Sequence, residues 1–259
     1  MKKKINQIAT LLSESNYPVV MTGAGMSVES GIPPFRGTSG IWTKYGQPKL
    51  DSFSDFKKNP TKWWDNRRNL TIDKHIMELR ESLKNAKPHL GHYSLCWLEK
   101  NKYIKSIITQ NIDGLDLIAG SKKVIEIHGN RKRLRCLSCN KRIDLGEYLP
   151  VYAPEPCEIC GGTVKFDTVL FGEPIPKDIM KNSRQEIDKS DLIIAVGTSA
   201  TVRPASGLFW IAKSQGAKII EVNIEKTKLT TISDYFINSK AKSFFVDLEN
   251  ELAANSNHK

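Results

Sequence analysis

The chain of 259 residues contains no apolar run that approaches the roughly 20 residues of a membrane-spanning helix. Its first residues, Met1–Lys4, resemble the start of a signal peptide, but the positions that follow are too polar for the apolar segment of one. Ile5, Ile8, Leu11 and Leu12 instead predict one face of an opening helix. We therefore expect a cytoplasmic protein without a membrane partner.

A plain dinucleotide fingerprint, G-x-G-x-x-G, is also missing, because Val28 occupies the position of the third glycine. The apolar run Tyr17–Thr22 nevertheless predicts a buried strand that ends in Gly23-Ala24-Gly25, a turn whose glycines allow close approach to a phosphate. A tight strand–helix turn without a ligand uses the same glycines. The following Pro33–Gly37 adds rigid prolines, an aromatic ring and a cation, which favours a loop over a dinucleotide.

An acidic residue is absent from Thr38–Gly46, where a dehydrogenase usually carries one about 20 positions after the glycine turn to bind the ribose. The sequence has no serine elbow of the kind that presents a nucleophile either. These absences argue against hydride transfer and against serine hydrolysis.

Basic residues exceed acidic ones, and the formal net charge is +11. A charge of this sign suits nucleic-acid binding, but the lysines are scattered and only Arg131–Arg135 forms a dense cluster. That cluster adjoins a cysteine pair and is interpreted as a solvated face or a site for an acidic partner. Specific nucleic-acid binding is not predicted.

Apolar runs alternate with helical patterns along the chain, which predicts an α/β fold with a Rossmann-like, doubly wound parallel sheet. The predicted strands are Tyr17–Thr22, Tyr103–Thr109, Val124–Ile127, Asp191–Val196 and Lys218–Val222.

Polar residues follow these strands where they end, at the edge where open α/β sheets bind ligands. Gln110–Asp113 follows the second strand, His128 the third, Gly197–Ser199 the fourth and Asn223 the fifth. Asn111 and Asp113 offer a donor and an acceptor to a carboxamide such as that of nicotinamide. Alternatively, the Asp113 carboxylate caps the turn that follows it.

Two Cys-x-x-Cys pairs, Cys136/Cys139 and Cys157/Cys160, predict a zinc ribbon in which four thiolates close a tetrahedral structural site. Redox chemistry at the pairs is the competing interpretation, and it is disfavoured in a cytoplasmic chain. The module interrupts the sheet order at about residues 131–166. The remaining cysteine, Cys96, lies on a predicted helix and is expected to be a small buried hydrophobe.

The segment 38–88 has no strand pattern and is rich in aromatic residues, which suits a mobile cover over a cleft or a small helical unit with an aromatic core. A helix is expected to begin near His89. Since no carboxylate or thiol nearby completes a metal set, His89 and His92 are expected to be structural.

Together these motifs resemble those of the sirtuins, the NAD-dependent protein-lysine deacylases, in their bacterial type. The resemblance spans nearly the whole chain and rests, in the family's order, on Gly23–Gly37, Thr109–Leu115, Ile127–Gly129, the two cysteine pairs, Phe171–Glu173, Gly197–Ser199 and Val222-Asn223.

The resemblance implies that NAD is a consumed co-substrate. The acyl-lysine oxygen attacks C1′ of its nicotinamide ribose, nicotinamide departs as product and inhibitor, and His128 acts as general base on a ribose hydroxyl, with Asn111 as the other catalytic residue. The cofactor-binding residues that it implies are Gly23, Ala24, Gly25, Ser27, Phe35, Arg36, Gln110, Asn111, Ile112, Asp113, His128, Gly197, Thr198, Ser199, Asn223, Ile224 and Ala241. Val169, Leu170, Phe171 and Gly172 match the segment that pairs with the backbone of an acylated-lysine peptide or protein.

Two positions depart from the family's pattern. Pro34 stands where the family has Asp or Thr, which removes a hydrogen-bonding side chain from the cofactor loop. The branch that removes succinyl and malonyl groups carries Tyr-x-x-Arg in its cover segment, and this chain has Trp64 and Arg67 there. Arg67 retains the charge for a carboxylate, but Trp64 lacks the hydroxyl, so we expect removal of acetyl or longer apolar groups.

The resemblance also implies a division of the chain. The NAD-binding domain comprises 1–37, 89–130 and 167–259, the helical cover segment 38–88, and the zinc module 131–166. Mono-ADP-ribosyl transfer or plain NAD cleavage is the alternative within enzymes. A module that senses NAD or ADP-ribose without catalysis is the alternative outside them.

Overall fold

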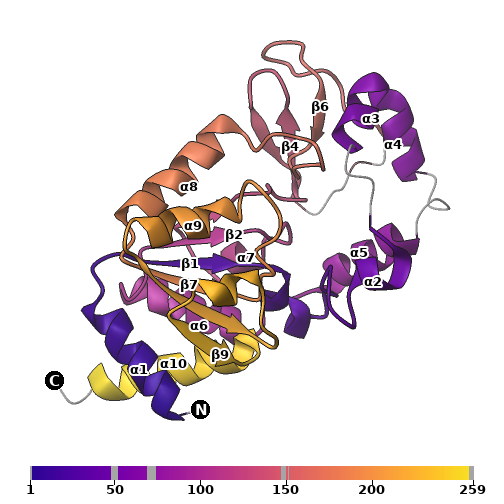
Figure 1. Ribbon diagram of the computed structural model, residues 1–259. Coiled ribbons are helices and arrows are strands. Elements are labelled where there is room, and N and C mark those ends of the chain that lie inside the picture. Colours follow the sequence, from indigo (N-terminus) through magenta and orange to yellow (C-terminus); the bar gives the residue numbers. More distant parts are fainter. Residues whose placement is uncertain (1, 48–51, 69–73, 147–149, 151, 257–259) are drawn as a thin grey trace.

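The computed structural model describes residues 2–47, 52–68, 74–146, 150 and 152–256. Its larger part is a six-stranded parallel sheet in the order β3-β2-β1-β7-β8-β9 (Figure 1). The strands are β1 (Pro18–Thr22), β2 (Ser106–Thr109), β3 (Val124–Glu126), β7 (Leu192–Val196), β8 (Lys218–Asn223) and β9 (Tyr235–Asn238). The order reverses between β1 and β7, the position at which open parallel sheets bind ligands.

All five predicted strands are present, and the sheet has a sixth, β9, that the sequence analysis missed. Strand β9 is only four residues long and pairs with β8 at the sheet edge, with Ile237 opposite Val222. Its apolar run, Tyr235–Ile237, is shorter than that of β7, and only Ile237 is fully buried.

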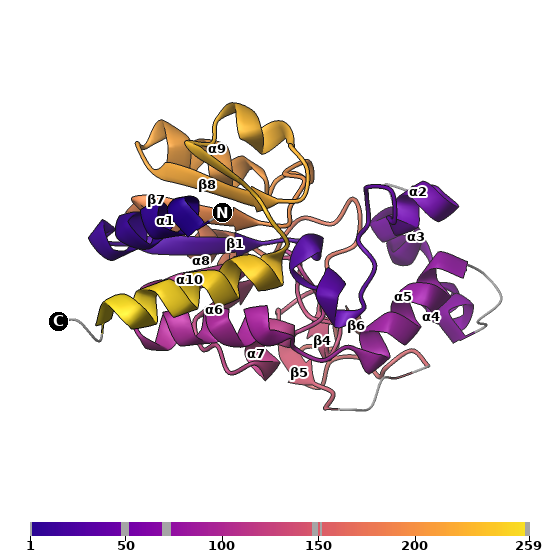
Figure 2. The same ribbon diagram turned by 90° about the horizontal axis from the view of Figure 1, so that it is seen from below.

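Helices cover both faces of this sheet, as predicted for a doubly wound fold. In β1, Val20 packs on one face with α1 (Lys2–Glu14), α6 (Leu90–Lys100) and α10 (Ala241–Ser256). Val19 and Met21 pack on the other face with α8 (Lys177–Lys189) and α9 (Gly207–Ser214). Figure 2 shows α9 and α10 on opposite sides of the strands. Because alternate residues of a strand point to opposite faces, a strand that is apolar throughout feeds two separate cores.

The segment between β1 and α6 is helical in the part that the structure describes, as predicted. Its elements are η1 (Ala24–Met26), η2 (Val28–Ser30), α2 (Ile41–Tyr45), α3 (Ser52–Lys58), α4 (Pro60–Arg68) and α5 (Lys74–Asn85). Two further short helices, α7 (Leu115–Ile118) and η3 (Lys228–Thr231), follow β2 and β8.

A second sheet, antiparallel and in the order β5-β4-β6, forms the inserted module. Its strands are β4 (Arg133–Cys136), β5 (Arg142–Asp144) and β6 (Val164–Phe166). Phe56 of α3 and Trp64 of α4 are buried in one cluster with Leu134, Val164 and Phe166 of this sheet. The helical segment therefore shares a core with the module, and α3 and α4 lie beside β6 in Figure 1.

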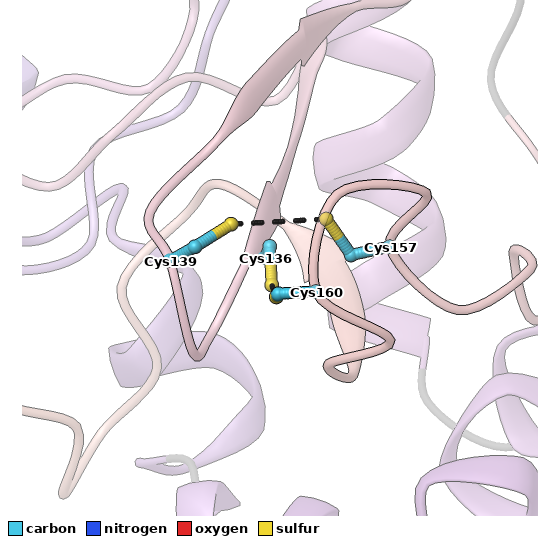
Figure 3. A group of neighbouring side chains, drawn as sticks. All are labelled: Cys136, Cys139, Cys157 and Cys160. Carbon is cyan, nitrogen blue, oxygen red and sulfur yellow. Dashed lines mark hydrogen bonds between the residues drawn. The ribbon is translucent and has the colours of Figure 1, made fainter.

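The four paired cysteines point toward one another at one end of the small sheet (Figure 3). The Cys136 and Cys160 sulfurs lie 3.6 Å apart, those of Cys139 and Cys157 lie 3.7 Å apart, and all four lie within 4.8 Å. Tetrahedral zinc with Zn–S bonds of about 2.3 Å places its sulfurs about 3.8 Å apart. The donor set and its spacing therefore fit a structural zinc ion with no open coordination position.

The predictions about three single residues, Cys96, His89 and His92, are confirmed. Cys96 is 2% exposed within α6. His89 caps the start of that helix, since its Nδ1 accepts a hydrogen bond from Gly91 N at 2.9 Å, and His92 is buried beside it.

Among the residues that the structure describes, no helix has the length and apolarity to cross a membrane.

Zinc removal is predicted to unfold the small sheet, because metal binding and folding are linked in such modules. Cys157→Ser or a strong chelator should abolish stoichiometric zinc, measured by mass spectrometry of the native protein. Each should also change the tryptophan fluorescence, since Trp64 packs on Phe166 with ring centroids 4.9 Å apart. Cys96→Ser is the control and should retain one zinc per chain. A purified chain that lacks zinc and does not respond to chelator would contradict the assignment.

Candidate active site

The loops after β1 and β7 meet backbone against backbone at the point where the strand order reverses. Gly23 N donates to Val196 O at 2.9 Å, and Gly25 N donates to Gly197 O at 2.8 Å. A Cβ on Gly25 would lie 2.6 Å from the Gly197 Cα, and Gly197 itself has a φ of +59°. Side chains at these positions would force the loops apart, so the predicted glycines set the close contact of the two loops.

Asn111 joins the loop after β2 to the same place. Its Nδ2 donates to Gly23 O at 2.9 Å and to Ser27 Oγ at 3.1 Å, and the Ser27 hydroxyl donates to Asp113 Oδ2 at 2.7 Å. All three side chains are buried. The predicted residues Gly23, Ser27, Asn111 and Asp113 therefore form one hydrogen-bonded network across two loops.

Asp113 serves the fold as well as this network. Its Oδ1 accepts from Leu115 N at 2.9 Å, so the capping interpretation of this residue is also correct. Burial raises the pKa of the Asp113 carboxyl. The neighbouring Asp116, which the sequence analysis did not select, is buried too, and desolvation together with the Asp113 charge raises its pKa to about 7.

The polar residues on the β7 side converge on Thr198. Gln110 Nε2 donates to Thr198 Oγ1 at 3.0 Å, and Asn223 Nδ2 donates to Thr198 O at 3.2 Å. These contacts bring together predicted residues from the ends of β2, β7 and β8.

Three other predicted residues, Ile112, Ile224 and Ala241, come from the segments after β2 and β8 and from α10. Ile112 O accepts from Arg131 N at 3.0 Å. Ile224 is 65% exposed, directly after Asn223, whereas Ala241 is buried at the start of α10.

An aromatic cluster lies over the loop that contains the predicted cation. The Arg36 guanidinium carbon is 4.4 Å from the Trp42 ring centroid, and its Nη1 donates to Ser199 Oγ at 3.4 Å. Trp42 also contacts Phe35, at a centroid distance of 5.1 Å, and Phe171, at 5.7 Å. Trp42 was not among the predicted site residues, although its place in an aromatic segment after the glycine loop was a usable signal.

His128 lies two residues after the end of β3, and burial lowers its pKa to about 4. Its imidazole is therefore neutral near pH 7, as a proton acceptor must be. The next residue, Gly129, has a φ of +74°, and a Cβ there would lie 2.1 Å from Asp167 O. This turn brings the chain beside the predicted peptide-binding segment, because His128 O accepts from Val169 N at 2.9 Å.

The residues predicted to contact the acyl group lie in α4. The Trp64 side chain is 2% exposed and packs against Trp63 and Phe166, in the core shared with the small sheet. The Arg67 side chain lies outside the described part of the structure.

Arg133 and Arg135 of the basic cluster form ion pairs with carboxylates of the chain itself, so the interpretation of the cluster as a solvated face was wrong for these two residues. Arg133 pairs with Glu126, and Arg135 pairs with Glu173 and, at 3.1 Å, with Asp167. The Arg135 side chain is only 5% exposed. The sequence pattern gave no sign of these carboxylates, because Asp167 and Glu173 lie across a long insertion.

Comparison with known proteins relates nearly the whole chain to one protein family. The Sir2 family model matches residues 23–204. The chain is 40% identical over 231 residues to "NAD-dependent protein deacylase 1" of Archaeoglobus fulgidus, covering 89% of this chain and 90% of the relative. It is 37% identical to "NAD-dependent protein deacylase" of Thermococcus kodakarensis, covering 98% and 99%.

Solved structures agree with these relatives. A Sir2 homologue in complex with NAD superposes with a TM-score of 0.79 at 37% identity and covers 96% of this chain and 94% of its own. A Sir2 protein with a p53 peptide and NAD superposes with a TM-score of 0.75 at 31% identity, covering 96% and 98%. The motifs, the fold and these matches agree, and the chain belongs to the Sir2 family.

Proposed function

We propose that this chain is an NAD-dependent protein-lysine deacylase that transfers the acyl group of an acylated lysine to ADP-ribose and releases nicotinamide. The observation that carries the proposal is the position of His128, a neutral imidazole that follows β3 and is bonded through its own carbonyl to Val169. The names of the relatives and the NAD complex of a Sir2 homologue support the cofactor.

The residues at the sheet edge fit a dinucleotide. Where the strand order reverses, the Gly23–Gly25 loop and Gly197 are in contact through their backbones alone. Arg36 supplies a cation beside Ser199 that can pair with a diphosphate. Gln110, Thr198 and Asn223 supply donors and acceptors for the ribose and adenine half. The network through Asn111, Ser27 and Asp113 orients the side chains of the nicotinamide region.

NAD supplies an electrophilic ribose carbon with nicotinamide as the leaving group. The residues of the chain position this carbon against the acyl oxygen of lysine and exclude other nucleophiles, and we assign the second role to the ring of Phe35. His128 Nδ1 or Nε2 accepts the proton of a ribose hydroxyl, which makes that hydroxyl a nucleophile toward the acyl carbon. The net reaction consumes one water and gives lysine, nicotinamide and O-acyl-ADP-ribose.

The substrate is an acylated-lysine peptide or protein whose backbone pairs with Val169–Gly172. A Sir2 protein with a bound p53 peptide supports this class of substrate. Because pairing of this kind recognises main chain, the substrate sequence is loosely specified. Nicotinamide, as the departing product, inhibits by competing for its own site.

We infer that the protein is cytoplasmic, because four cysteines grouped to bind zinc must remain thiols and a reducing compartment maintains them in that form. Two arginines of the basic cluster, Arg133 and Arg135, are paired with carboxylates of the chain itself, which supports the expectation that the cluster is not a specific nucleic-acid site.

His128→Ala is predicted to lower the deacylation rate by about 10²- to 10⁴-fold, the usual contribution of a positioned general base. The variant should still bind NAD, as measured by calorimetry, because the glycine loops and Arg36 are untouched. Mass spectrometry of the wild-type reaction should detect O-acyl-ADP-ribose. ADP-ribose attached to protein would favour the transferase alternative, and an unchanged cellular effect of His128→Ala would favour a sensor.

The pH dependence follows from the partly buried imidazole of His128. A general base must be neutral, and the pKa of His128 lies at about 4 in the free protein. The value of kcat/KM should therefore stay level as the pH falls from about 7 to 5.5 and drop only below that range. Circular dichroism at each pH serves as the control for folding. An acid limb centred near 6.5 would show that burial does not lower the His128 pKa.

Acetyl-lysine peptides and peptides with longer apolar acyl groups should turn over faster than succinyl-lysine peptide. Trp64 has no hydroxyl for a succinyl carboxylate, and its ring is buried against Phe166. Steady-state kcat/KM on peptides that differ only in the acyl group measures the preference. Equal or faster turnover of the succinyl peptide would contradict it.

A further inference from the structure

Two cations occupy directly opposed positions in the small antiparallel sheet. Arg135 of β4 and Lys165 of β6 are cross-strand partners, and their side chains are 5% and 1% exposed. Like charges in this arrangement repel, and burial strengthens the repulsion. The pair therefore requires an anion from outside the sheet.

Glu173 supplies that anion, from beyond the end of the predicted peptide-binding segment Val169–Gly172. Its Oε1 pairs with Arg135, and its Oε2 lies 3.0 Å from Lys165 Nζ. The Glu173 side chain is 2% exposed. One carboxylate thus holds both cations and ties the chain after the segment to the zinc module.

Glu173 and Lys165 also form hydrogen bonds with the backbone in and beside the segment Val169–Gly172. Glu173 Oε2 accepts from Leu170 N at 2.9 Å, while Glu173 N donates to Leu170 O at 2.9 Å. Lys165 Nζ donates to Thr168 O at 2.7 Å, directly before Val169, and to Phe166 O at 2.7 Å. Buried charges therefore bond the chain directly before the segment, at Thr168, and within it, at Leu170.

These bonds leave the segment in a fixed position relative to His128. Val169 N donates to His128 O at 2.9 Å, and Phe53 N donates to Phe171 O at 3.0 Å. Buried charge pairs hold their geometry because breaking one leaves an uncompensated charge. A backbone that must pair with an incoming strand gains affinity when its conformation is fixed before binding.

We propose that Lys165 and Glu173 are positioning residues for the acyl-lysine substrate. They hold Val169–Gly172 in the conformation that binds the peptide backbone, and they contact neither NAD nor the reacting atoms. The inference rests on the proposed deacylase function. It assigns to the zinc module a part in peptide binding, through a lysine of its own strand β6.

The test uses Glu173→Gln, Lys165→Met and the double variant Lys165→Met/Glu173→Gln in the full-length, zinc-loaded protein. The double variant removes one charge of each sign, and Arg135 keeps its ion pair with Asp167, so no buried charge is left unpaired if a single variant fails to fold. We expect KM for an acetyl-lysine peptide to rise at least tenfold in the double variant. KM for NAD and kcat at saturating peptide should change by less than twofold, and zinc content should remain one per chain.

Arg142→Met is the matched control. Arg142 belongs to the same network, through Asp167 and Asp178, but bonds neither Lys165 nor Glu173, so its removal should leave KM for the peptide unchanged. Peptide KM within twofold of wild type in the folded double variant would overturn the inference, as would equal rises in KM for the peptide and for NAD. A wild-type protein without deacylase activity would instead refute the proposed function, so the two failures are distinguishable.

Discussion

The contact of the loop after β1 with the loop after β7 is the constraint on which the site depends. Backbone touches backbone at Gly25 and Gly197, with no space for a side chain on either. Polar residues from separate parts of the chain meet because these loops meet: Ser27 on one, Thr198 and Ser199 on the other. Asn111 then bonds a third loop to Gly23 O, so that three strand ends form one surface. The reversal of strand order brings the two loops side by side at the sheet edge, and the glycines allow their backbones to come into contact.

Burial sets the charge state of this surface. It lowers the pKa of His128 and raises those of Asp113 and Asp116, so each group is shifted toward its neutral form. These shifts favour the neutral form of each group, while Arg36 supplies a cation beside Ser199. The same exclusion of water suits a reaction in which a positive ring leaves a sugar carbon and water must not capture that carbon first.

Local patterns predicted much of the fold and the site. Apolar strands with polar tips identified five strands and the residues at their ends, and the spacing of four cysteines identified the metal module. What escaped prediction depends on contacts between distant segments. Strand β9 is defined by its pairing with β8, and the burial of Trp64 depends on Phe166, about a hundred residues away. The arginine cluster was interpreted as solvent-exposed because its partners, Asp167 and Glu173, are distant in the sequence. Only the folded insertion brings them to Arg135.

The core shared by α3, α4 and the small sheet has an architectural consequence. Its two halves leave the sheet of the large domain at different points, one after β1 and the other after β3, yet Phe56, Trp64 and Phe166 bury one another. Each excursion buries apolar side chains of the other. Any opening or closing of the molecule must therefore move α3, α4 and the sheet that carries the four cysteines as one lobe.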